Sequence, residues 1–128
     1  MDTKFSVVVI TYNRPDYLIL SLQSVLAQTK TPVEIIIVND CSTVSYADVI
    51  STFIDDRIKY IKLQKNLGAN GCRNIGVDTA SGDVVAFLDD DDIWFPDFLE
   101  LHAMKYSEGA SAVVSGHRRL GTDIVKVK

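Results

Sequence analysis

The sequence predicts an α/β domain in which an open, mostly parallel sheet is flanked by helices on both faces. Short apolar runs rich in β-branched residues alternate along the chain with segments whose apolar residues recur at helical spacing. Such alternation is typical of a parallel sheet with right-handed crossovers. The chain has 128 residues, of which 47% are hydrophobic and 23% charged. These values fit a single domain, residues 1–128, that can build a substantial core.

The expected strands are short apolar runs bounded by turn residues. They cover Phe5–Ile10, Val33–Val38, Ile58–Leu63, Val84–Leu88 and Ala110–Ser115, with a weaker β-like run at Asp123–Val127. Continuous apolar runs such as Phe5–Ile10 are typical of strands buried on both faces. The run Ile58–Leu63 instead alternates apolar residues with lysine, which indicates a more exposed strand near an edge of the sheet.

The expected helices follow from apolar residues at helical spacing. They cover Asp16–Gln28, Tyr46–Ile54, Cys72–Ala80 and Pro96–Tyr106. The segment Asn66–Gly71 is expected to be a loop before the third of these helices. Trp94 is expected either in the core or at the wall of a site.

Polar segments follow three of the expected strands at the point where each strand ends. They are Thr11–Arg14, Asn39–Ser42 and Asp89–Asp92. In an open parallel sheet the carboxyl ends of the strands share one edge, and ligands bind just beyond it. These segments are therefore expected to converge on a single site.

The four consecutive aspartates Asp89–Asp92 are the most conspicuous of these segments. Neighbouring carboxylates repel one another and raise each other's pKa values. A divalent cation, Mn²⁺ or Mg²⁺, bound through carboxylate oxygens with phosphate supplying further ligands, would offset that repulsion. The alternative is a solvated acidic turn that caps the helix expected from Pro96.

Other residues near the same edge suit a nucleotide diphosphate. Asp40 could accept hydrogen bonds from a ribose or a base, or cap the next helix, and Thr11 and Asn13 offer short polar groups beside it. Arg14 could meet a phosphate or a surface carboxylate. Arg73 is expected at a helix N-terminus, where phosphate binds readily, with an ordinary surface ion pair as the alternative.

Composition and missing motifs exclude several other classes. A net charge of −4 argues against a nucleic-acid partner. No signal peptide is visible, and no apolar run approaches the roughly 20 residues that a membrane helix needs, so no integral membrane segment is expected. Cys41 and Cys72 are expected to be free thiols. No G-x-G-x-x-G motif of a dinucleotide-binding enzyme and no acidic pair of a phosphoacceptor signalling domain follows the first strand.

Several ordered motifs resemble those of family 2 glycosyltransferases of the GT-A fold, a Rossmann-like architecture. They are Val7–Pro15, Ser24–Thr29, Glu34–Ser42, Asn66–Gly68 with Arg73–Gly76, and Phe87–Asp92 with Trp94 and Pro96. The resemblance runs in order over roughly residues 5 to 105. It implies transfer of a sugar from a nucleotide-diphosphate sugar, commonly a UDP-sugar, to an acceptor hydroxyl with inversion.

The resemblance also implies roles for individual residues. The nucleotide-sugar would be bound by Thr11, Tyr12, Asn13, Arg14, Asp40, Arg73, Asp89 and Asp90. Asp91 would ligate Mn²⁺ or Mg²⁺ in a DxD-type motif. The chain departs from the family at Cys41, where a glycine or asparagine is usual, which leaves the backbone of that turn undetermined.

The family's catalytic base, an Asp or Glu, lies in a second half that also binds the acceptor, and nothing around Asp123 resembles that motif. The chain is therefore expected to be an incomplete, donor-binding portion, whether a shortened form or a degraded reading frame. It would bind UDP and metal but transfer sugar poorly, with its base beyond Lys128.

The family suggests a glycan or lipid-linked acceptor and a setting in polysaccharide biosynthesis. We expect a location in the cytoplasm, either free or peripheral to the inner face of the membrane. An exposed face meant for the second half would favour self-association. The alternative function is a non-catalytic nucleotide-binding or interaction domain.

Overall fold

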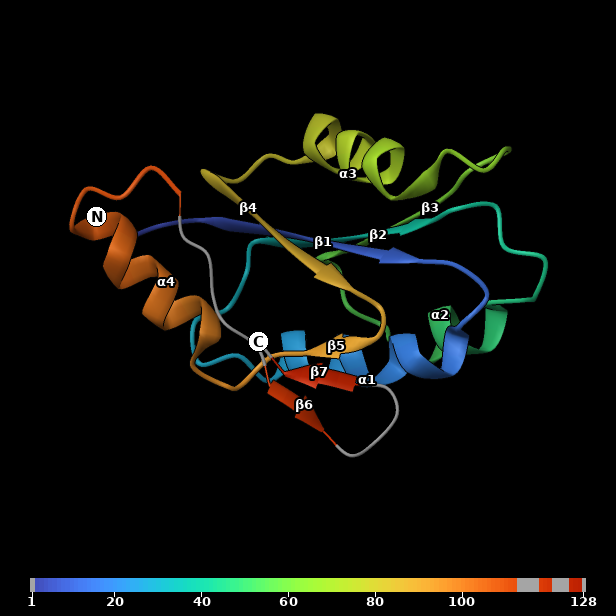
Figure 1. The fold of residues 1–128 in the computed structure, drawn as a ribbon, viewed down its shortest axis with the longest axis horizontal. Helices are drawn as coiled ribbons and strands as arrows, with labels where there is room; N and C mark the ends of the chain where they lie inside the picture. The colour runs from blue at the N-terminus through green and yellow to red at the C-terminus, as the bar shows by residue number, and fades with distance from the viewer. Residues whose placement is uncertain (1, 113–117, 121–124, 128) are drawn as a thin grey trace.

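A computed structural model describes residues 2–112, 118–120 and 125–127, with side chains described as far as residue 112. Its centre is a parallel sheet of four strands in the order β3-β2-β1-β4 (Figure 1). The strands are β1 Phe5–Thr11, β2 Glu34–Asn39, β3 Ile58–Lys62 and β4 Val84–Asp89. Each begins and ends within one residue of its predicted bounds, and β3 lies at an edge, as its alternating pattern predicted.

The middle strands are buried on both faces because their apolar runs are continuous. β1 pairs with β2 from Ser6 opposite Glu34, and with β4 from Phe5 opposite Val84. Alternate β1 side chains enter different cores, with Val7 and Val9 on one face and Val8 on the other.

Helices cover both faces of the sheet, as expected (Figure 1). They are α1 Pro15–Leu26, α2 Ala47–Thr52, α3 Gly68–Thr79 and α4 Phe98–Ser107. α1 and α2 pack on the face that carries Val7 and Val9. α3 packs on the opposite face through Cys72. Its Gly76 lies so close to Val8 that an added Cβ would fall 2.4 Å from Cγ1 of that valine.

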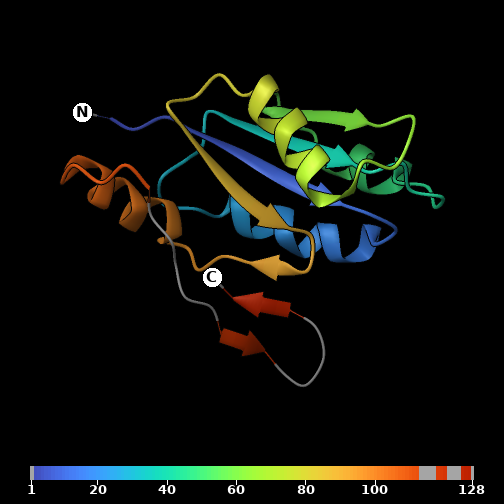
Figure 2. The same cartoon turned by 45° about the horizontal axis from the view of Figure 1, so that its top comes forward.

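The segment after β4 leads away from the main sheet. β5 Asp92–Ile93, β6 Arg118–Leu120 and β7 Val125–Val127 form a second sheet in the order β5-β7-β6 (Figure 2). β7 lies within the β-like run predicted over Asp123–Val127. Trp94 is 4% exposed and stacks on Phe98 with ring centroids 4.2 Å apart, which places it in the core.

Two predictions about element boundaries were wrong. α3 begins at Gly68 and not at Cys72, so the expected loop to Gly71 is mostly helical. The strand expected over Ala110–Ser115 is absent at residues 110–112, and residues 113–115 lie outside the described part. The Ala110 N–H instead donates to the Lys105 carbonyl, and Gly109, with φ of 100°, closes the end of α4. Within the described residues, no helix has the length and apolar character needed to cross a membrane.

Candidate nucleotide and metal site

A cleft of about 410 Å³ lies at the carboxyl ends of the parallel strands. The predicted site residues that line it are Tyr12, Arg14, Asp40, Arg73, Asp89, Asp90 and Asp91, together with Ile10, Asn66 and Ala69. The expected convergence of the strand-end segments is therefore present. The volume of the cleft lies in the range of small-molecule sites, about 300–1,000 Å³.

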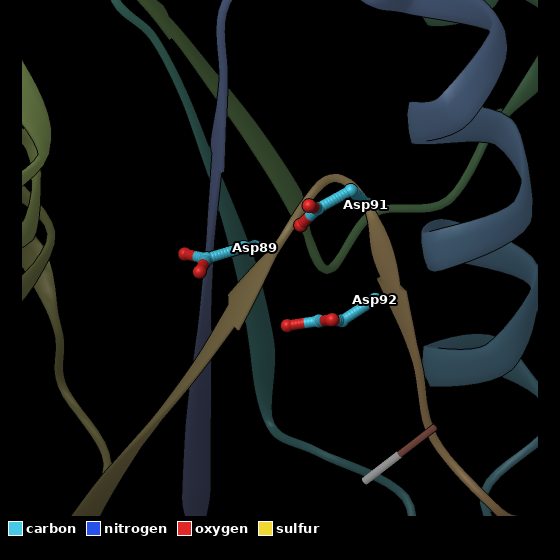
Figure 3. A group of neighbouring side chains, drawn as sticks. All are labelled: Asp89, Asp91 and Asp92. Carbon is cyan, nitrogen blue, oxygen red and sulfur yellow. The ribbon is translucent and has the colours of Figure 1, made fainter. Parts of the chain in front are cut away.

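Three of the four aspartates form a compact acidic group on this edge. Asp89 ends β4, Asp91 lies in the turn, and Asp92 begins β5. One carboxylate oxygen from each lies within 4.8 Å of the others, and Figure 3 shows the side chains projecting from the turn on the side away from α1. Hard oxygen donors in this arrangement fit Mg²⁺ or Mn²⁺. The sequence singled out Asp91 as the ligand, and the structure places Asp89 and Asp92 beside it.

Asp90 is turned into the protein and is 2% exposed. Its Oδ2 accepts hydrogen bonds from the Thr11 hydroxyl at 2.8 Å and from the Tyr12 N–H at 3.3 Å. Its Oδ1 lies 2.7 Å from Nη2 of Arg14. Burial raises the pKa of Asp90 above its ordinary value, against the Thr11 hydrogen bond and the Arg14 charge, which lower it. Asp90 thus ties the end of β1 to the acidic turn.

A buried tyrosine that the sequence did not single out as a site residue completes this network. Tyr46 Oη accepts a hydrogen bond from the Arg14 N–H at 2.9 Å and lies 2.6 Å from the Thr11 hydroxyl. Because the single Thr11 proton is donated to Asp90, Tyr46 is the donor to Thr11. Thr11 is 1% exposed and lies behind the cleft wall, where its hydroxyl is occupied by these two partners.

The turns after β1 and β2 are bonded to each other. The Asn13 N–H donates to Ser42 Oγ at 2.9 Å, and the Thr43 N–H donates to Asn13 Oδ1 at 2.8 Å. Asn13 and Cys41 both have positive φ, 52° and 58°. The turn at Cys41 is thus left-handed, a conformation that glycine and asparagine adopt more readily than cysteine. Asn13 therefore shapes the two turns and is not among the residues that line the cleft.

Asp40 caps α3, and not the next helix in sequence. Its Oδ1 accepts the Leu67 N–H at 2.7 Å and its Oδ2 accepts the Gly68 N–H at 3.1 Å. These bonds satisfy free amides at the helix N-terminus, which is why α3 begins earlier than predicted. Burial, with the Asp40 carboxylate nearby, raises the pKa of the Cys72 thiol to about 11. Through its bonds to the Leu67 and Gly68 N–H groups, Asp40 also fixes the adjacent Asn66 at the cleft.

Two arginines flank the acidic group. Nη1 of Arg14 lies 3.7 Å from Asp91, and Nη2 of Arg73 lies 3.5 Å from Asp89. Arg73 is in the second turn of α3, so its predicted place at the helix N-terminus was wrong. Both guanidinium groups are partly exposed and line the cleft, where they could contact an anionic ligand.

Comparisons with known proteins match most of the chain. The model of the family named Glycosyl transferase family 2 matches residues 6–126. Glycosyltransferase GlyA of Streptococcus pneumoniae is 36% identical over 119 residues, covering 91% of this chain and 17% of GlyA. Succinoglycan biosynthesis protein ExoO of Rhizobium meliloti is 38% identical over 92 residues, covering 72% of this chain and 26% of ExoO.

Solved structures agree in fold. Residues 1–349 of TarS from S. aureus, in complex with UDP, align with a TM-score of 0.73 and 32% identity over 82% of this chain and 32% of that one. The chain spans less than half the length of GlyA, ExoO and this TarS structure.

Proposed function

This chain belongs to glycosyl transferase family 2 and has the GT-A fold, and we propose that it binds the UDP-sugar donor of a metal-dependent, inverting glycosyltransferase. The observation that carries the proposal is the convergence of acidic and basic side chains from separate strand ends on one cleft. The structure of TarS with UDP, a protein of similar fold, supports the choice of nucleotide.

The acidic group would hold the cation. Asp89, Asp91 and Asp92 supply oxygen donors within 4.8 Å of one another, which suits Mn²⁺ or Mg²⁺. When bound, such a cation acts as a Lewis acid that stabilises a diphosphate leaving group. Arg14 and Arg73, on either side of the group, would contact the diphosphate oxygens, for which guanidinium geometry is well suited.

The nucleoside would lie toward Tyr12 and Asp40. Tyr12 lines the cleft and is 44% exposed, so its ring would be available to stack on a base. The Asp40 carboxylate has about four lone-pair sites, of which the α3 amides use two and the Cys72 thiol faces another, which leaves acceptor capacity for a base N–H or a ribose hydroxyl.

In the inverting reaction, a carboxylate base removes the proton of the acceptor hydroxyl, whose oxygen attacks the anomeric carbon. The bond from that carbon to the diphosphate breaks, and UDP leaves with the electron pair. The residues of the cleft have donor-binding roles in this scheme, so the chain alone should bind UDP but transfer sugar poorly. A glycan or lipid-linked acceptor in polysaccharide synthesis is proposed, since ExoO is named for succinoglycan biosynthesis.

Calorimetric titration of UDP tests the donor site. We expect binding in the presence of Mn²⁺, loss of at least about tenfold in affinity with a chelator, and a similar loss in Asp91→Ala. Asp56→Ala, which removes an exposed aspartate outside the cleft lining, is the matched control and should bind like the wild type.

The outcomes separate the parts of the proposal. Equal UDP binding with and without chelator would reject metal dependence, and no binding under any condition would reject the donor site. The alternative of a non-catalytic nucleotide-binding domain predicts the same titrations. It differs in that the whole protein would transfer no sugar to any acceptor.

A further inference from the structure

The Arg14 guanidinium bridges two adjacent carboxylates of the acidic turn. Its Nη2 lies 2.7 Å from Asp90 Oδ1, and its Nη1 lies 3.7 Å from Asp91 Oδ2. The shorter contact is to a carboxylate that is almost fully buried, and the longer one is to a carboxylate on the cleft. The positively charged Arg14 guanidinium therefore already occupies part of the space around Asp91.

The backbone of Arg14 and one side of its guanidinium are held more closely than the side that faces Asp91. The backbone N–H of Arg14 donates to the buried Tyr46 hydroxyl, and its guanidinium carbon lies 5.7 Å from the centre of the Tyr17 ring. The side chain is nevertheless 46% exposed. Its Nη1 can thus leave Asp91 while the backbone and the contact to Asp90 stay in place.

A divalent cation would use the same Asp91 carboxylate. Asp91 belongs to the acidic group with Asp89 and Asp92, whose ligand oxygens lie within 4.8 Å. A divalent cation and the Arg14 guanidinium repel each other when both approach Asp91. Occupation of the acidic group therefore favours a turn of Nη1 away from this carboxylate.

We propose that Arg14 competes with the divalent cation for Asp91 and thereby couples metal binding to diphosphate binding. This inference rests on the proposed function of the cleft. A diphosphate beside the cation offers the displaced guanidinium a new anionic partner. Each ligand then strengthens the binding of the other by the same factor. Arg14 contributes to that factor in addition to any direct contact between metal and phosphate.

The test measures Mn²⁺ affinity by calorimetry for the full chain, with and without saturating UDP. Arg14→Gln should bind Mn²⁺ alone about two- to five-fold more tightly than the wild type, the range expected for losing a partly exposed ion pair. The factor by which UDP raises Mn²⁺ affinity should fall in the same variant. Lys105→Gln removes one positive charge at an exposed pair with Glu108 and should change neither quantity.

A second variant keeps the test valid if Arg14→Gln folds poorly. Arg14→Lys retains the charge, but a single ammonium group cannot span both carboxylates, so Mn²⁺ alone should bind with an affinity between those of the wild type and Arg14→Gln. Unchanged or weaker Mn²⁺ affinity in the folded variants, with UDP and Mn²⁺ still bound by the wild type, overturns the coupling role alone. Failure of the wild type to bind both ligands overturns it together with the proposed function.

Discussion

Replacing Glu34 by glutamine should destabilise the domain at the end of the sheet opposite the cleft. Glu34 begins β2 and is 3% exposed. Its Oε2 accepts hydrogen bonds from the Ser6 hydroxyl and from the N–H and hydroxyl of Ser81, and its Oε1 lies 2.7 Å from Lys59 Nζ. One carboxylate thus joins β1, β2, β3 and the turn before β4.

The pKa of Glu34 sets the size and the pH range of the effect. Burial raises this pKa, but the hydrogen bonds from Lys59, Ser6 and Ser81 outweigh burial and lower it from 4.5 to about 2. At about 1.4 kcal/mol per pH unit, this difference corresponds to about 3 kcal/mol of folding free energy. Because the folded pKa is depressed, this stability is present above about pH 4.5 and is lost as the pH falls toward about 2.

Urea unfolding followed by circular dichroism checks this prediction. At neutral pH, Glu34→Gln should lower the free energy of unfolding by about 2 to 3 kcal/mol. Between about pH 4.5 and pH 2 the wild type should lose stability more steeply than the variant, which lacks this titration. Glu108→Gln, at an exposed pair with Lys105, should change stability by less than about 0.5 kcal/mol. Parallel pH profiles for the wild type and Glu34→Gln would refute the reasoning.

Two further substitutions test contacts on either side of the sheet. Tyr46→Phe removes the hydroxyl that lies between the backbone N–H of Arg14 and the Thr11 hydroxyl. The free energy of unfolding should therefore fall by about 1 to 2 kcal/mol, and UDP affinity measured by calorimetry should weaken. An unchanged midpoint of urea unfolding would contradict this prediction. Gly76→Ala places a Cβ 2.4 Å from Val8 Cγ1 and should lower the free energy of unfolding in urea by about 1 to 3 kcal/mol. The control Asn74→Ala, on the exposed face of α3, should not lower it. Equal stability of the two variants would show that the structure relaxes around the added Cβ.

Most of the sheet was predictable from local composition. The runs that form β1, β2 and β4 are apolar, which is typical of parallel strands covered on both faces, and the alternation with lysine in β3 indicated an edge strand. The convergence of the strand ends was also predictable, because alternating strands and helices make a parallel sheet whose strands all end at the same edge. The family resemblance, on ordered motifs, correctly indicated the GT-A fold.

Features that depend on distant partners were not predictable. The start of α3 depends on Asp40, which caps the helix from the turn after β2. The strand expected from Ala110 does not form over its described residues, because the Gly109 and Ala110 N–H groups donate to carbonyls at the end of α4. Tyr46 has no motif of its own, and only the approach of α2 to the β1 turn gives its hydroxyl two partners.

The sequence by itself determined the class of the fold and the chemistry available at one edge of the sheet. Periodicity and residue type are local properties, and they are sufficient to place carboxylates and arginines after particular strands. Only the tertiary structure decided how the four aspartates divide their roles. Asp90 turns inward to Thr11 and Arg14, whereas Asp89, Asp91 and Asp92 face one another. That division depends on which way each side chain points from the turn, and the packing of β1, α1 and β5 around the turn sets those directions.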